Sequence, residues 1–152
     1  MSRDVIPNPT LQRLQVLVVD DDVDTCTLLK FALETYGIQA HVASSARQAL
    51  QTFVSLQPHL LISDIAMPNE DGYWLLRKLR ALEAGKPSIT PAIAVTAWHD
   101  EDQIQSSGFH RLVKKPFRLD ELIGAIAELV MQYNLATLTP TLTQFTRASL
   151  VP

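Results

Sequence analysis

Five polar residues stand where short apolar runs of the chain end. Asp20 and Asp21 follow one run, Asp64 follows a second, Thr96 ends a third and Lys115 follows a fourth. Carboxylates about 4 Å apart repel by roughly 4 kcal/mol per pair at an effective dielectric constant of 20. A hard divalent cation relieves this repulsion, and Mg²⁺ suits a few carboxylates together with water and a phosphate oxygen. A hydroxyl and an ammonium beside such a centre are what phosphoryl transfer requires, so the residues predict a magnesium-dependent site of that kind.

The apolar runs have the form of short strands buried on both faces of a sheet. Amphipathic stretches alternate with them, and the last follows the i, i+3, i+4, i+7 rule of a helix. We expect strands at 16–19, 38–43, 60–62, 92–95 and 112–114, and helices at about 24–36, 100–107 and 118–133. Two more helices are expected, one after a capping box of Ser45 and Gln48 and one that follows the loop marked by Gly72 and runs to about Glu83. This alternation implies right-handed βαβ units, and therefore one parallel sheet with helices on both faces. The polar strand ends then meet in the crevice where such sheets bind ligands.

The first helix is expected to bury a stripe of apolar side chains against the sheet. Leu28, Leu29, Ala32 and Leu33 are the members of this stripe, and Gly37 is the stop signal at the carboxyl end of the helix.

Composition limits the class of protein. The chain has 152 residues, 47% of them apolar and 19% charged, which is typical of one globular domain. The net charge is −3, so no direct binding to nucleic acid is expected. The single Cys26 cannot form an internal disulfide, which fits a cytoplasmic location. No signal-peptide core and no run of about 18 apolar residues is present, so membrane insertion is not expected.

Three segments are predicted from composition along the chain. Residues 1–13 carry two prolines and are expected to be a flexible lead-in, and residues 14–133 form the domain. Residues 134–152 are rich in threonine and are interpreted as a linker or disordered tail. The Thr/Leu alternation of the tail leaves a strand or a dimer contact open, so a homodimer is possible.

Four segments carry a family resemblance: VLVVDDDVDT, LLISDIAMPNEDG, AVTAW and VKKPF, in this order. Together they resemble the receiver domain of two-component response regulators, over about residues 14–133. The resemblance implies a flavodoxin-like α/β fold, a doubly wound five-stranded parallel sheet of order 2-1-3-4-5 with helices on both faces. It implies a regulatory phosphoacceptor rather than an enzyme, which assists its own phosphorylation and dephosphorylation. The donor would be a sensor histidine kinase or a phosphotransfer protein, and phosphorylation would switch contacts with an unknown downstream protein.

The resemblance also assigns roles to single residues. Asp64 would accept the phosphoryl group from a phosphohistidine. Asp20 and Asp21 match the acid pair that binds Mg²⁺, with Asp21 the more direct ligand. Asp64 and the backbone carbonyl of Ala66 would complete the protein's share of the metal site.

Thr96 and Lys115 would bind phosphoryl oxygens. The peptide bond from Lys115 to Pro116 is expected to be cis, as it is in the family, because only a bond that precedes proline adopts the cis form at low energetic cost. Two positions depart from the family pattern. Leu112 stands at the switch position, where the family usually has Tyr or Phe. Trp98 stands at the rim of the site, where an indole could slow hydrolysis of the phosphoryl group.

Two other functions remain open from the residues alone. The first is a phosphatase of the haloacid-dehalogenase type, because VLVVDDDV fits its motif with Asp20 as nucleophile and Asp22 as acid/base. That family has an acidic pair at a later strand end, whereas the acids after Lys115 all fall in the last predicted helix: Asp120, Glu121 and Glu128. The second is an unphosphorylated scaffold module, against which the complete set of acids, threonine and lysine argues.

Overall fold

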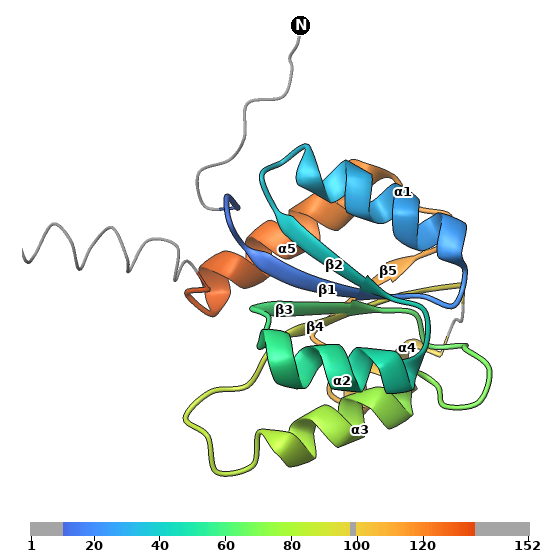
Figure 1. The fold of residues 1–152 in the computed structure, drawn as a ribbon, viewed down its shortest axis with the longest axis vertical. Helices are drawn as coiled ribbons and strands as arrows, with labels where there is room; N and C mark the ends of the chain where they lie inside the picture. Colours follow the sequence, from blue (N-terminus) through green and yellow to red (C-terminus); the bar gives the residue numbers. More distant parts are fainter. Residues whose placement is uncertain (1–10, 98–99, 136–152) are drawn as a thin grey trace, which may run out of the picture.

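Five strands alternate with five helices in the part of the chain that the computed structural model describes, residues 11–97 and 100–135 (Figure 1). The strands are β1 (Gln15–Val19), β2 (Gln39–Ala43), β3 (Leu60–Ser63), β4 (Ala92–Thr96) and β5 (Arg111–Lys114). The helices are α1 (Val23–Glu34), α2 (Ala46–Leu56), α3 (Gly72–Leu82), α4 (Glu101–Ser106) and α5 (Leu119–Gln132). Each lies within a few residues of its expected bounds.

All strand pairs are parallel, and the strand order is β2-β1-β3-β4-β5. This confirms the predicted doubly wound sheet. The chain runs outward from β1 to β2 and then crosses back to β3, so the direction of winding reverses between β1 and β3. In open sheets of this kind ligands bind outside the carboxyl ends of the strands at that point.

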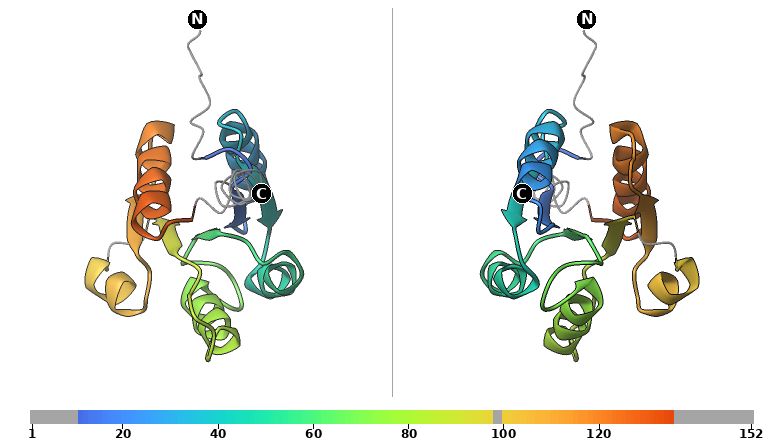
Figure 2. Two further views of the ribbon diagram at one scale, coloured as in Figure 1. Left: turned by 90° about the vertical axis from the view of Figure 1, so that its left-hand side faces the viewer. Right: turned by 90° about the vertical axis from the view of Figure 1, so that its right-hand side faces the viewer.

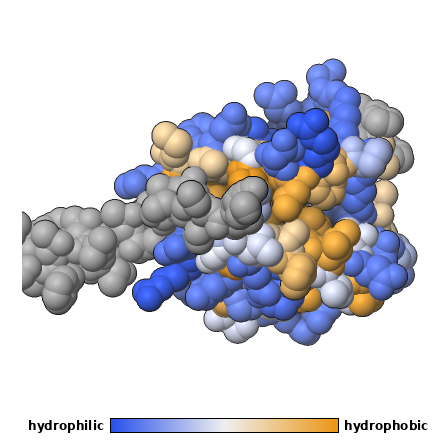
Figure 3. Space-filling view, turned by 90° about the horizontal axis from the view of Figure 1, so that it is seen from above, coloured by the Kyte–Doolittle hydropathy of each residue, from blue (hydrophilic) through white to orange (hydrophobic). Residues whose placement is uncertain are grey.

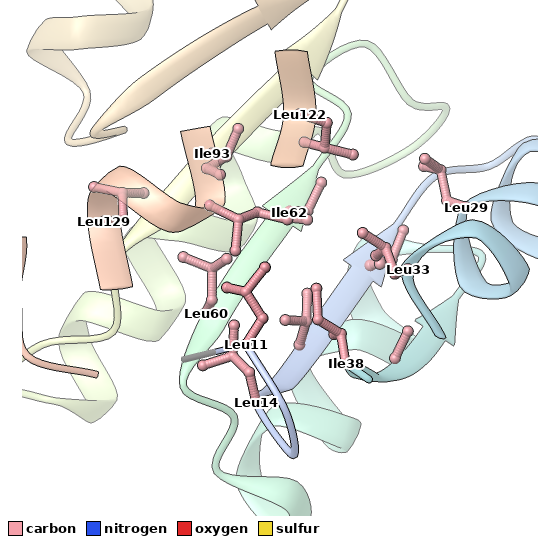
Figure 4. Close-up of a cluster of buried hydrophobic side chains, with 14 of the residues drawn as sticks. Leu11, Leu14, Leu29, Leu33, Ile38, Leu60, Ile62, Ile93, Leu122 and Leu129 are labelled. Carbon is pink, nitrogen blue, oxygen red and sulfur yellow. The ribbon is translucent and has the colours of Figure 1, made fainter. Parts of the chain in front are cut away.

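The helices form two layers, one on each face of the sheet (Figure 2). Helices α1 and α5 cover one face, and α2, α3 and α4 cover the other. Each layer encloses its own apolar cluster, which explains why β1, β3 and β4 are apolar almost throughout. The cluster under α1 and α5 is drawn in Figure 4, where leucines of both helices lie near side chains of β3 and β4: Leu29, Leu33, Leu122 and Leu129 from the helices, and Leu60, Ile62 and Ile93 from the strands.

The buried stripe of α1 differs from the expected one. The helix buries Cys26, Leu29 and Leu33, whereas the side chain of Leu28 is 68% exposed. Successive residues of a helix lie about 100° apart, so Leu28 and Leu29 cannot both face the sheet squarely. The prediction that placed Leu28 in the core was therefore wrong.

Two apolar side chains just outside the expected bounds of 14 and 133 also contact the core of the domain. Leu11 is fully buried in the cluster of Figure 4, and the backbone N–H of Arg13 donates to the carbonyl of Gly37 at 2.8 Å. At the other end Leu135 packs on the same cluster, and its N–H donates to the carbonyl of Val130 at 2.9 Å. Leu11 and Leu135 thus pack against the domain, while residues 1–10 and 136–152 lie outside the described part.

Helix α4 has six residues and lies inside the expected range of 100–107. Among the helices of the described residues, α5 is the longest, with 14 residues. Within 11–97 and 100–135, no helix is long and apolar enough to cross a membrane.

Candidate functional site

Strand register brings the polar strand ends together. Val19 of β1 pairs with Ser63 of β3, and the N–H of Asp64 donates to the carbonyl of Val19 at 2.8 Å, one residue beyond the strand. On the other side Thr96 pairs with Lys114, and the N–H of Lys115 donates to the carbonyl of Thr96 at 3.0 Å. The parallel ladder therefore places the residues that follow β1, β3, β4 and β5 at one edge of the sheet.

Three carboxylates form the centre of this edge. Each of Asp20, Asp21 and Asp64 offers one oxygen, and these oxygens lie within 4.8 Å of one another. Asp20 and Asp64 are buried, while Asp21 is exposed. The backbone N–H of Asp22 donates to Oδ1 of Asp20 at 2.9 Å and fixes the orientation of that carboxylate. Hard oxygen donors at this spacing, open to solvent on the side of Asp21, fit a small divalent cation such as Mg²⁺.

Lys115 lies against the two buried carboxylates. Its Nζ is 2.7 Å from Oδ2 of Asp20 and 3.4 Å from Oδ2 of Asp64. Burial opposes the charged form of Lys115, but the hydrogen bond to Asp20 and the charges of both carboxylates outweigh it, so its pKa is raised. The ammonium thus stays charged between Asp20 and Asp64. The Lys115–Pro116 peptide bond that follows is cis, as expected.

Asp64 has a raised pKa, and burial is the main cause. The charge of Lys115 opposes the rise, the charge of Asp20 adds to it, and hydrogen bonds from Ile65 and Thr96 also oppose it. The Ile65 contact is a backbone N–H that donates to Oδ1 of Asp64 at 2.7 Å. One carboxylate oxygen of Asp64 therefore accepts from the backbone, while the other faces Lys115.

Asp22 serves the helix and not the cluster. Its side chain caps α1: Oδ1 accepts from the N–H of Asp24 at 3.1 Å and Oδ2 from the hydroxyl of Thr25 at 2.9 Å. The hydroxyl of Thr25, first among the causes, holds the pKa of Asp22 below its ordinary value. A phosphatase of the haloacid-dehalogenase type would need Asp22 as its acid/base, so this geometry does not favour that alternative.

The other predicted residues are placed as follows. Thr96 is buried at the end of β4, and Ala66 is exposed in the loop after Asp64. Leu112 is half-buried on β5 and packs on the cluster under α2 and α3. Trp98 lies outside the described residues.

Sequence reasoning missed two residues that contact the main chain at Asp64 and Ile65. Ser63 is fully buried, and its hydroxyl donates to the main-chain carbonyl of Asp64 at 2.7 Å. The N–H of Gly72 donates to the carbonyl of Ile65 at 2.8 Å. The sequence carried little signal for Gly72, because this glycine stands in the loop expected before a helix, and glycine is common in loops whether or not two backbones approach closely.

The fold and this cluster together define a class: a doubly wound α/β domain with an acidic phosphoryl-transfer site at its switch point. Comparison with protein families agrees, since residues 16–127 match the model of the response regulator receiver domain. The chain belongs to this family, whose members are signalling modules of two-component systems. The resemblance seen in the sequence is thereby confirmed, and nothing in the comparisons supports the phosphatase or scaffold alternative.

Curated relatives include full-length and partial matches. An uncharacterized 14.6 kDa protein in the sodA1 3′ region of Leptolyngbya boryana is 44% identical over 130 residues, which span 84% of this chain and 95% of that protein. The regulatory protein AtoC of Escherichia coli is 33% identical over 111 residues, 71% of this chain but 23% of AtoC. The regulator PhoP of Salmonella typhimurium is 32% identical over 117 residues, 77% of this chain and 52% of PhoP. The chain thus spans only part of the latter two.

Solved structures of receiver proteins share the fold. The response regulator TrrA of Thermotoga maritima, in complex with Mg²⁺ and BeF, has a TM-score of 0.68 at 30% identity and covers 76% of this chain and 97% of that one. The receiver domain of Francisella response regulator 1452 has a TM-score of 0.71 at 30% identity, covering 80% of this chain and 99% of that one.

Proposed function

We propose that Asp64 is the phosphoacceptor of this receiver domain and takes its phosphoryl group from a phosphohistidine. One observation carries the proposal: Asp64 is buried at the end of β3, with oxygens of Asp20 and Asp21 within 4.8 Å and the ammonium of Lys115 at 3.4 Å. A buried carboxylate among other carboxylates is costly unless its charge is used or neutralised. The burial is therefore explained by chemistry at Asp64 better than by stability.

Mg²⁺ fits the donor set, and Asp20, Asp21, Asp64 and the carbonyl of Ala66 would hold it. When bound, the ion supplies positive charge that neutralises the oxygens of the transferred phosphoryl group. Asp21 is the most exposed of the three acids, which suits the residue that a hydrated ion meets first.

The chain's own residues prepare Asp64 for attack on phosphorus. The N–H of Ile65 holds Oδ1 of Asp64, which leaves Oδ2 toward Lys115 and the open side of the cluster. Lys115 stays charged and would bind an oxygen of the incoming group, as would the hydroxyl of Thr96. In this way the domain would assist its own phosphorylation, and water reaching the same site would allow dephosphorylation.

The donor would be a sensor histidine kinase or a phosphotransfer protein, which must dock beside Asp64. Helix α1 begins three residues after Asp20 and exposes large apolar side chains: Val23, Leu28 and Phe31, at 62%, 68% and 71%. Figure 3 looks down on the side that α1 and α5 cover and shows apolar colour gathered in a patch there. An exposed apolar patch of this kind marks a protein-binding surface.

Output would follow through contact with another protein in the cytoplasm, and not by direct binding to nucleic acid.

Phosphoramidate, a small donor with an N–P bond, tests the proposal. With Mg²⁺ present, the protein should gain one phosphoryl group, seen as a slower band on a phosphate-affinity gel, and Asp64→Asn should gain none. Asp24→Asn is the matched control, because Asp24 is an exposed acid nearby and lies outside the cluster. Label on Asp64→Asn at the normal rate would overturn the proposal. So would hydrolysis of p-nitrophenyl phosphate that Asp20→Asn abolishes and Asp64→Asn leaves intact.

A further inference from the structure

Gly72 begins α3 directly against the backbone of Asp64. A Cβ built on Gly72 would lie 2.4 Å from the main-chain oxygen of Asp64 and 2.9 Å from Cα of Ile65. Real Cβ atoms do not approach other heavy atoms this closely. The backbone of Gly72 is not in the left-handed region, so glycine is required here by space and not by conformation.

The same main-chain oxygen of Asp64 also accepts a hydrogen bond from a side chain. The buried hydroxyl of Ser63 donates to it at 2.7 Å. The next residue, Ile65, makes two backbone hydrogen bonds. Its carbonyl accepts from the N–H of Gly72 at 2.8 Å, and its N–H donates to Oδ1 of Asp64 at 2.7 Å. A continuous chain of contacts therefore runs from the start of α3 to the carboxylate of Asp64.

Helix α3 cannot easily move to make room. Leu75, Leu76 and Leu79 are buried in the cluster between α3 and the sheet, and the side chain of Asp71 caps the helix by accepting from the N–H of Trp74 at 2.8 Å. A side chain at position 72 would push instead on the loop at Asp64 and Ile65. The Ile65 N–H would then move relative to Oδ1 of Asp64.

We infer that Gly72 and Ser63 are positioning residues for phosphoryl transfer: Gly72 leaves room for the main-chain carbonyl of Asp64, Ser63 donates a hydrogen bond to that carbonyl, and together they fix the direction in which the carboxylate of Asp64 points. The inference rests on the proposed role of Asp64 as phosphoacceptor. Neither residue belongs to the set proposed to hold the phosphoryl group or the metal. Their effect is on the rate at which a folded domain is labelled, because a reacting group must be held in the geometry of attack.

The experiment measures the labelling rate with acetyl phosphate and Mg²⁺, and the Mg²⁺ dissociation constant, for the full chain and its variants at a temperature where each is folded by circular dichroism. Gly72→Ala should slow labelling at least about tenfold, since misplacement of a reacting group by about 1 Å can cost on the order of 100-fold. It should also weaken Mg²⁺ binding several-fold, because Asp64 is one of the ligands. Ser63→Ala adds no atoms, so it keeps the inference falsifiable even if Gly72→Ala does not fold, and it should slow labelling about threefold.

Two controls separate positioning from stability. Gly124→Ala adds a methyl group in α5, where nothing lies within 4 Å, and should be labelled at the normal rate. Leu129→Ala removes a fully buried side chain far along α5, so it should lower the unfolding midpoint without changing the labelling rate of the folded protein.

Each outcome decides the inference. Normal labelling of folded Gly72→Ala would overturn it, as would normal labelling of Ser63→Ala. Recovery of Gly72→Ala by a second change, Ile65→Val, would also overturn it, because the cost would then lie in the side chain of Ile65 and not in the backbone of Asp64. If the unchanged protein were not labelled at Asp64 at all, the proposed function itself would fall, and the inference with it.

Discussion

At the residue scale, the candidate site places three carboxylates against one ammonium. Lys115 contacts Asp20 and Asp64, the two buried members, while Asp21 faces solvent. This arrangement leaves Asp64 with a raised pKa, because burial disfavours its charged form more than Lys115 favours it. The charge of Asp64 is thus maintained at a cost in folding free energy.

Asp64→Asn should therefore stabilise the metal-free protein at neutral pH, by about 1 kcal/mol. An acid whose pKa is raised on folding binds more protons folded than unfolded, so its contribution to stability is present below its ordinary pKa of 3.8 and is lost as pH rises through the raised value. Urea denaturation with a chelator present, at pH 7 and at pH 4, checks this. A variant less stable than the parent at pH 7 would contradict the burial argument.

Lys115→Met should destabilise the metal-free protein. It leaves Asp20 and Asp64 without their counter-charge, so the free energy of unfolding without metal should fall by about 2–3 kcal/mol, somewhat below the loss for a fully buried ion pair because Lys115 is partly solvated. Mg²⁺ should still bind, since Lys115 donates no ligand, and should restore more stability in the variant than in the parent. Loss of Mg²⁺ binding, measured by calorimetry, would show that the site geometry is wrong.

At the scale of elements, the two edges of the sheet do different work. The carboxyl ends of the strands carry the acids. At the amino ends of the strands, two histidines, each directly before a strand, accept hydrogen bonds from the backbone. Nδ1 of His59 accepts the N–H of Gln15 at 2.9 Å, and Nδ1 of His110 accepts the N–H of Ala92 at 3.1 Å. Both imidazoles must be neutral at Nδ1 to accept these bonds, and burial lowers the pKa of each.

These histidines predict a loss of stability on mild acidification. A histidine whose pKa is lowered on folding binds fewer protons folded than unfolded, so its contribution is complete above its ordinary pKa of 6.5 and is lost as pH falls below it. The slope is at most about 1.4 kcal/mol per pH unit for each. In the double variant His59→Asn and His110→Asn, which keeps an acceptor without a titrating ring, the free energy of unfolding should vary less between pH 7 and pH 5. An unchanged slope would contradict the assignment.

The face built on α4 and β5 should respond weakly to phosphorylation. Leu112 offers neither a hydroxyl nor a flat ring to exchange between two positions, and Lys114 of β5 is tied to Glu101 of α4 at 2.6 Å. A population shift requires contacts that differ between two states, and leucine supplies few. Hydrogen exchange with and without beryllofluoride should show its main change in the loops after Asp64 and Thr96. A large change across 100–113 would contradict this.

At the scale of the whole molecule, periodicity predicted a parallel sheet with helices on both faces and the strand ends predicted the members of the cluster, whereas the strand order was implied by the resemblance to the receiver family. Asp20 and Asp64 could be found because parallel strands bring their carboxyl ends to one edge, which needs only the strands and their order. The burial of Leu11 could not be predicted from the sequence. Two nearby prolines suggested a flexible segment, whereas this part of the chain is held by a hydrogen bond to Gly37, which is distant in the sequence. The role of Ser63 could not be predicted either, because its hydroxyl contacts a backbone atom, and such a contact leaves no recognisable pattern in the sequence.

The central claim is that Asp64 accepts the phosphoryl group, and mass spectrometry tests it most directly. After incubation with acetyl phosphate and Mg²⁺, the intact protein should gain the mass of one phosphoryl group, and peptide mapping at low temperature should place it on Asp64. Chelation of Mg²⁺ should prevent the gain. A phosphoryl group mapped to Asp20 or Asp21, or full labelling of Asp64→Asn, would contradict the account.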